Sequence, residues 1–242
     1  MSQDRGKRIV DLMDVYEKAK GYEILSKLHN LNTSFIIVKR NYDELYNIII
    51  RFQSDSHIWA LERRPQFTAT LIEITRVLQN YLGGASSLIR HSSVFRDNLA
   101  NSTFSEEYKE KLKKVEWQHC VIFVKKLRNY THHCKLPIIR AKFSVTRKDA
   151  HNSEFGKEIR VCLSKQDLLK WDGWCRTSKK YIETLGDDLD ILRFIGEYND
   201  VVLNFHRWIM RRIPELYDSE IQELKRIKNQ INELKKKVND TS

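Results

Sequence analysis

The chain has 242 residues, a formal net charge of +11, three prolines and eight glycines. That length suffices for one large domain, or for one domain with appended helices. No apolar run approaches the ~18–20 residues of a membrane span, so we expect no membrane insertion. The N-terminus lacks the apolar core of a signal peptide, and the four cysteines lack close paired spacing. We therefore expect a cytoplasmic protein with reduced thiols.

Apolar residues recur at helical spacing through most of the chain, which predicts a mainly α-helical protein. The expected helices cover residues 7–29, a segment that begins at Asp43, and residues 66–90, 105–115, 165–185 and 188–212. In the third of these helices, the pair Gly83 and Gly84 predicts a kink or the close approach of another backbone. Ser164 is expected to cap the helix that follows it.

Two short segments after the central helices alternate between apolar and polar residues. The first covers residues 138–147, the second covers residues 157–163, and a polar connection separates them. Alternation with a period of two is typical of strands that have one apolar face. We therefore predict a small β-hairpin within residues 138–164.

Residues 115–131 contain no Gly or Pro and predict a helix. Trp117, Val121 and Val124 fall on one line of this helix, and Arg128 continues that line. A charge on a core-facing line is costly unless it is paired or lines a wet cleft. Arg128 is therefore a candidate for a functional site.

The end of this helix carries the motif RNYTHH at residues 128–133. A histidine can exchange protons near neutral pH, and a guanidinium can hold phosphate oxygens in a planar fork. Metal-free cleavage of a phosphodiester needs both kinds of group. Arg128 and His133 are roughly 140° apart around an ideal helix, whereas Arg128 and His132 share a face. Pro137 predicts that the helix ends shortly before it.

Positive charge gathers around this motif. Residues 109–148 contain twelve Lys and Arg residues but only two Glu residues, so they carry nearly the whole net charge. Such a cluster is typical of a nucleic-acid partner, with a solvated helix face as the plainer alternative. The lysines that we expect to contact RNA are Lys109, Lys111, Lys113, Lys114, Lys125, Lys126 and Lys135.

The motif resembles the signature of the HEPN superfamily, in which a polar residue follows Arg and a His stands five positions after Arg. The matching residues here are Arg128, Asn129 and His133. Residues 71–91 resemble the long helix against which the motif helix packs in that family. The resemblance covers about residues 62–210. It implies a HEPN-like antiparallel helical bundle with a small β-hairpin after the motif helix.

The resemblance also implies a metal-independent endoribonuclease of the toxin or anti-phage type, with no cofactor and no metal. A ribose 2′-hydroxyl would attack the adjacent phosphate and leave 2′,3′-cyclic phosphate and 5′-hydroxyl ends. His133 is then the general acid or base, Arg128 binds the phosphate, Asn129 orients the imidazole or the RNA, and His132 is an accessory candidate. The implied partners are RNA, a second copy that completes a composite site, and an antitoxin or regulatory protein. One subgroup of the family has a Tyr two residues after the His and pairs with a nucleotidyltransferase antitoxin. Here that position is Lys135, so we do not expect that antitoxin as a partner.

Three other interpretations stay open. In the first, Arg128 pairs with a carboxylate such as Glu73, and both histidines are ordinary helix-end residues that the helix dipole favours. In the second, the chain is a catalytically silent HEPN module that binds RNA or a partner protein. In the third, it is a helical coiled-coil adaptor, an interpretation that leaves the basic cluster unexplained.

The C-terminal segment repeats apolar residues at heptad spacing. They are Met210, Tyr217, Leu224, Ile231 and Val238, with Ile213, Ile227 and Leu234 in the complementary positions. Such a seam either pairs with a second copy or lies along its own domain. We therefore divide the chain into an N-terminal helical extension at 1–61, a HEPN-like domain at 62–212 and an amphipathic C-terminal helix at 213–242.

Overall fold

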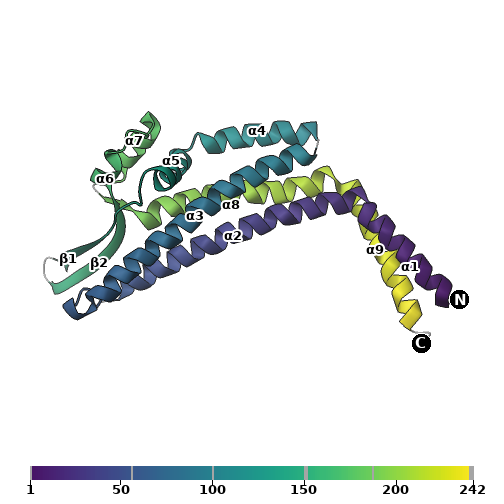
Figure 1. Ribbon diagram of the computed structural model, residues 1–242, viewed down its shortest axis with the longest axis horizontal. Coiled ribbons are helices and arrows are strands. Elements are labelled where there is room, and N and C mark those ends of the chain that lie inside the picture. Colours follow the sequence, from purple (N-terminus) through teal and green to yellow (C-terminus); the bar gives the residue numbers. More distant parts are fainter. Residues whose placement is uncertain (1, 56, 100, 150–151, 187, 240–242) are drawn as a thin grey trace.

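The computed structural model describes residues 2–55, 57–99, 101–149, 152–186 and 188–239. The molecule is elongated and mainly helical, with a small sheet at one end and both termini at the other (Figure 1). No helix within the described ranges is long and apolar enough to cross a membrane. The prediction of a mainly helical protein with a small antiparallel sheet is therefore confirmed.

Two long helices, α2 (Lys20–Ser54) and α3 (Arg64–Leu99), lie side by side and form the central pair of the bundle (Figure 1). The helix α8 (Ile191–Leu216) packs against α2 and contributes to the same core. The buried Tyr81 of α3 donates a hydrogen bond to the backbone carbonyl of Ile195 at 3.5 Å. These contacts make one continuous hydrophobic core, because apolar residues at three- and four-residue spacing face inward on each helix.

The helices α4 (Ser102–Glu116) and α5 (His119–His133) complete the central part of the bundle. Asn101 caps α4, since its side-chain oxygen accepts a hydrogen bond from the backbone N–H of Phe104 at 2.9 Å. The helix α5 packs against α3, α8 and the short helix α7 (Arg176–Thr184). The motif helix is thus held from several sides.

The sheet has three antiparallel strands in the order β1-β2-β3. They are β1 (Ile139–Asp149), β2 (Asn152–Ser164) and β3 (Asp188–Asp190). Ile139 pairs with Leu163, which fixes the register of the hairpin. Asp190 ends the third strand and caps α8 through a 2.9 Å hydrogen bond from the backbone N–H of Leu192.

The predicted hairpin within residues 138–164 is confirmed, but its strands are longer than expected. Most of the segment that looked like a polar connection belongs to the strands, and residues 150–151 lie outside the described part. The third strand was not predicted, because three residues are too short to show an alternating pattern. Ser164 caps α6 (Lys165–Leu169) as expected, accepting a 3.3 Å hydrogen bond from the backbone N–H of Asp167.

Several predicted helix boundaries are wrong. The helix expected over residues 7–29 is divided at Ala19, where an extended backbone ends α1 (Ser2–Lys18). The helix α2 then continues through Asp43 without a break, because residues such as Val38 are buried in its middle. The helix expected over residues 165–185 is two short helices, α6 and α7.

The continuous helix expected over residues 115–131 is also wrong. The helix α4 ends at Glu116, and the extended backbone of Gln118 (φ −73°, ψ 131°) precedes α5. Trp117 lies in this connection and is 73% exposed. No Gly or Pro in the sequence marks this break.

Of the two alternatives for the glycine pair, the close approach of another backbone is confirmed at Gly84. A Cβ atom at this position would lie 3.1 Å from the Asn41 side-chain nitrogen and 3.5 Å from Val38, both in α2. At the neighbouring Gly83, a Cβ atom would meet nothing within 4 Å, and α3 continues through both residues. The missing side chain at Gly84 therefore allows α2 and α3 to pack closely.

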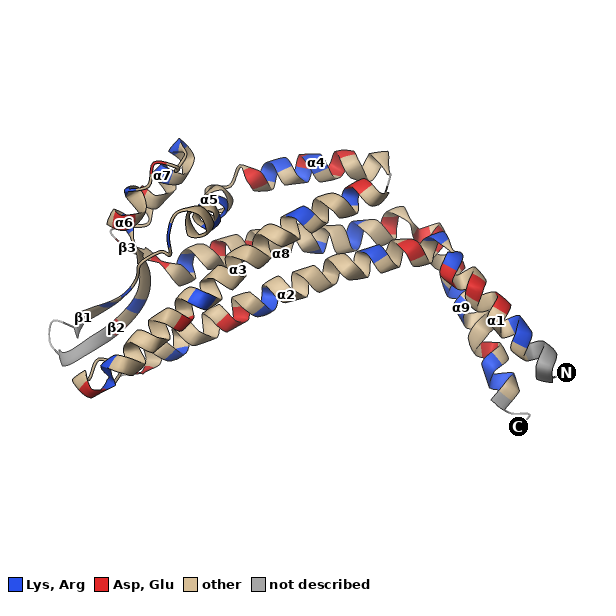
Figure 2. Cartoon of the chain, viewed as in Figure 1, with Lys and Arg blue, Asp and Glu red and all other residues tan. Residues whose placement is uncertain are grey.

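The C-terminal helix α9 (Asp218–Asn239) packs against α1 and the start of α2, and it forms an arm that projects from the bundle (Figure 1). Figure 2 shows charged residues of both signs along this arm. Leu224 and Ile231 of the heptad seam are buried. Gly21 permits this contact, because a Cβ atom there would lie 2.4 Å from the Glu220 carbonyl oxygen. Of the two alternatives for the seam, the structure shows packing within the chain.

Candidate functional site

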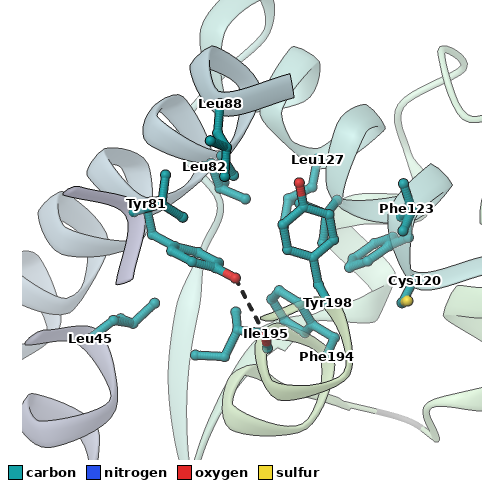
Figure 3. Close-up of a cluster of buried hydrophobic side chains, with 14 of the residues drawn as sticks. Leu45, Tyr81, Leu82, Leu88, Cys120, Phe123, Leu127, Phe194, Ile195 and Tyr198 are labelled. Carbon is teal, nitrogen blue, oxygen red and sulfur yellow. Dashed lines mark hydrogen bonds between the residues drawn. The ribbon is translucent and has the colours of Figure 1, made fainter. Parts of the chain in front are cut away.

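The polar motif is displayed on one face of α5 because the opposite face belongs to the core. Phe123 and Leu127 are fully buried, and Figure 3 shows them beside Phe194 and Tyr198 of α8. The rings of Phe123 and Phe194 meet edge to face with centroids 5.2 Å apart. With 3.6 residues per turn, this packing directs residues such as Lys125 away from the core.

The apolar stripe expected along the motif helix is not an exposed surface. Val121 and Val124 are 4% and 2% exposed and belong to the chain's own core. Trp117 is exposed but lies outside α5, because the chain turns between α4 and α5. The sequence also predicts that a dimer shelters Trp117, Val121 and Val124, and for the two valines this prediction is wrong. The break places the valines against the rest of the bundle.

Arg128 lies at the edge of the buried face and has no carboxylate partner in the described part of the chain. Its Nη1 donates a hydrogen bond to the side-chain oxygen of Asn129 at 3.4 Å, and its Nε is buried without an acceptor. Glu73, the carboxylate named as an alternative partner, binds Arg76 at 2.6 Å. The guanidinium therefore keeps donors for an anion.

A cavity of about 640 Å³ lies between α3, α4, α5 and α8. Arg128 and Asn129 line it on the α5 side, together with Lys125 and Lys126. Most of the remaining wall is apolar. The sequence did not reveal this cavity, because its wall combines residues from helices that are far apart in the chain.

The two histidines of the motif lie outside the cavity wall and are exposed. The ring centroids of His132 and His133 are 6.4 Å apart, with 50° between the ring planes. The helix ends at His133, which confirms the expected end before Pro137. The structure thus brings Arg128 and Asn129 together at the cavity and leaves His133 on the exposed last turn of the same helix.

The seven lysines expected to contact RNA lie on α4, on α5 and directly after α5. None of them forms an ion pair with an acidic group in the described ranges. Other basic residues of the cluster are paired, since Arg140 binds Asp167 at 2.9 Å and Lys142 approaches Asp188 at 3.4 Å. Among the described side chains of the cluster, the lysines without an ion pair therefore lie on α4, on α5 (Figure 2) and at Lys135 directly after α5.

No family model, no curated protein and no solved structure matches this chain. Two features define the candidate site, namely the guanidinium of Arg128 beside Asn129 and the unpaired lysines around them.

Another titratable residue of the cavity wall, His206, was not predicted to matter. It is buried, its ring stacks on Phe35 with centroids 3.9 Å apart, and its Nε2 is 3.1 Å from the side-chain oxygen of Asn32. Burial lowers the pKa of His206 to about 4. The imidazole is therefore neutral near neutral pH and contributes no charge to the cavity.

We expect the free energy of unfolding to fall as the pH is lowered from about 6.5, the ordinary pKa of histidine, towards 4. In that interval the unfolded chain binds a proton at His206 and the folded chain does not, so protonation favours unfolding. The contribution is complete above the unfolded pKa and is lost as the pH approaches the folded pKa. It amounts to on the order of 1–3 kcal/mol.

Urea denaturation of the wild type and of His206→Gln at several pH values measures this effect. The Gln side chain can still donate a hydrogen bond towards Asn32 but does not titrate, so the pH dependence should flatten. His29→Gln, at an exposed position on α2, is the matched control and should follow the wild type. Equal losses in wild type and His206→Gln would contradict the expectation.

Proposed function

We propose that this chain is a metal-independent endoribonuclease whose reactive groups lie on the exposed end of α5. The observation that carries the proposal is the guanidinium of Arg128, which has no carboxylate partner among the described residues and lies near Lys125 and Lys126, which form no ion pair there either. An uncompensated guanidinium is suited to bind a phosphate in a bidentate manner. The resemblance of residues 128–133 to the HEPN motif supports the same chemistry.

In the proposed reaction, the His133 imidazole takes the proton of a ribose 2′-hydroxyl. The 2′-oxygen forms a bond to phosphorus while the bond to the 5′-oxygen breaks. A second imidazole, from His132 or from a second copy, gives a proton to the departing 5′-oxygen. Arg128 holds the non-bridging oxygens as their charge increases, and Asn129 holds the guanidinium. The products are a 2′,3′-cyclic phosphate and a 5′-hydroxyl.

We further propose that two copies face each other across a two-fold axis. Arg128 and His133 lie on opposite flanks of the exposed face, roughly 140° apart on an ideal helix. A two-fold axis places the Arg128 of one copy near the His133 of the other and forms two equivalent sites. This proposal rests on the polar motif alone, since Val121 and Val124 are already buried within the chain.

A catalytically silent module that binds RNA or a partner protein is the second candidate. One observation favours it, because His133 does not line the cavity that Arg128 and Asn129 line. The same basic surface would then bind RNA without cutting it. Such a module would bind RNA with the same salt dependence but give no fragments.

Incubation with total RNA in the presence of EDTA distinguishes the two candidates. The enzyme should release fragments whose 5′-hydroxyl ends accept phosphate directly from a kinase. Their 3′ ends should resist adapter ligation until the cyclic phosphate is removed. Strict dependence on added magnesium, or fragments with 5′-phosphate ends, would contradict the metal-free mechanism.

The unpaired lysines should dominate the affinity for single-stranded RNA. Each phosphate contact that is lost lowers the slope of log K against log salt by about 0.7. Replacement of four of them by Gln should therefore reduce the slope by up to about 3 and weaken binding most at low salt. The four are Lys109, Lys113, Lys125 and Lys126.

A matched control removes the same charge from the arm. It replaces four exposed lysines of α9 by Gln, namely Lys225, Lys228, Lys235 and Lys236. Fluorescence anisotropy with labelled RNA at several salt concentrations measures both slopes. If the two variants lose affinity and slope equally, RNA responds to net charge alone and the proposed surface is wrong.

A further inference from the structure

The cavity beneath α5 has the size and the lining of a small-molecule site. Its volume of about 640 Å³ lies within the range of roughly 300–1,000 Å³ that is typical of ligand pockets. Apolar residues from five helices form most of the wall, including Leu31 of α2, Leu82 and Ala85 of α3, and Val202 and Ile209 of α8. An apolar ligand would bury its surface against these side chains, which favours its binding.

The charged groups of the wall favour an anion. Three cations line the cavity, Lys125, Lys126 and Arg128, against a single carboxylate from Glu116. The Nε of Arg128 is buried without an acceptor, and an unsatisfied buried donor carries a desolvation cost. A carboxylate or a similar acidic group at the guanidinium would remove that cost and form charge-assisted hydrogen bonds. Asn129 stands beside it and keeps its amide donors.

The rest of the wall offers little to a polar ligand. Ser92 is already hydrogen-bonded to the hydroxyl of Tyr108 at 2.8 Å, and the neutral His206 is bonded to Asn32 at 3.1 Å. The hydroxyls of Ser86 and Tyr198 also lie on the wall, but most of the lining side chains are apolar. A ligand with many hydrogen-bonding groups in its body would lose their hydration there without replacement.

We propose that this cavity binds a small amphipathic anion, with an aliphatic body among α3, α4 and α8 and an acidic head at Arg128 and Asn129. An aliphatic carboxylate is the simplest ligand of this class. The proposal concerns binding alone and does not depend on RNA cleavage.

Calorimetric titration with dodecanoate, below its micelle concentration and without RNA, tests the proposal. We expect saturable binding, and dodecylammonium of the same chain length should bind at least about tenfold more weakly because its head repels the cations. Bound dodecanoate should also raise the melting temperature in a concentration-dependent manner. Absence of saturable binding, or equal affinity for the two head groups, would overturn the proposal.

Two kinds of variant locate the ligand. Arg128→Met keeps an unbranched apolar side chain but removes the charge, so dodecanoate should lose at least about tenfold in affinity. Arg90→Met, at an exposed position on α3 outside the cavity wall, is the matched control and should bind as the wild type does. Equal affinities of Arg128→Met and the wild type would place the head group elsewhere.

The apolar body is tested by filling the cavity. Ala85→Phe adds a ring inside the wall and should abolish dodecanoate binding. Val202→Phe adds bulk from α8 and provides a second test if the first variant does not fold. Circular dichroism confirms that the variant used is folded. Unchanged binding in a folded variant of either kind would show that the ligand occupies another site.

Discussion

Replacement of His133 by Ala should lower the rate of RNA cleavage by about 10²–10⁴-fold, since a general acid or base contributes that much to proton transfer. RNA affinity should change little, because the lysines of α4 and α5 supply most of the phosphate contacts. The fold should also persist, because His133 is exposed at the end of α5.

His119→Ala is the matched control for this prediction. His119 is also exposed and lies on the same helix, but at its opposite end. It should retain wild-type activity. Cleavage of a labelled RNA in EDTA under single-turnover conditions gives the rates of all variants. Full activity in His133→Ala together with loss in His132→Ala would transfer the role to the neighbouring imidazole.

Local signals in the sequence predicted those features that depend on a few neighbouring residues. Pro137 predicted the end of α5, since the residue before a proline avoids helical backbone angles. Ser164 gave the start of α6, since its hydroxyl accepts a backbone hydrogen bond there. Alternating residues gave the hairpin, because side chains of a strand point to opposite faces in turn. These signals act within one turn or one strand.

Features that depend on packing between distant segments were not predictable in this way. The break at Gln118 and the continuity of α2 through Asp43 carry no local mark, because the neighbouring helices decide them. The heptad seam was compatible with a second copy or with packing along its own domain, and the fold shows that α9 packs against α1 and α2. The cavity was not predictable for the same reason, because Arg128 and His206 line it from helices that are far apart in the sequence.

The candidate site was likewise only partly predictable from the sequence. The sequence identified Arg128 and Asn129, and the structure places them side by side at 3.4 Å. The sequence also indicated that His133 would be turned away from Arg128, from the spacing of residues on a helix. Whether Arg128 and His133 act together then depends on how two copies of the chain assemble.

A mixture of two inactive variants answers this question. If each site takes Arg128 from one copy and His133 from the other, then Arg128→Ala and His133→Ala chains complement each other. A mixed dimer has one site with both groups intact and one site that lacks both. One of the two sites of a mixed dimer is intact, so purified mixed dimers should recover about half of the wild-type rate. Each variant alone should be lower by two or more orders of magnitude, as expected for loss of a general acid–base group or a phosphate-binding group.

The experiment requires exchange of subunits, so the two variants are co-expressed with different affinity tags and the doubly tagged dimers are purified. Doubly tagged dimers of two His133→Ala chains serve as the control and should stay inactive. If Arg128 and His133 act within one chain, no chain in the mixed dimer holds both groups and no activity returns. Light scattering at the assay concentration completes the test, because a stable and fully active monomer would contradict the composite site.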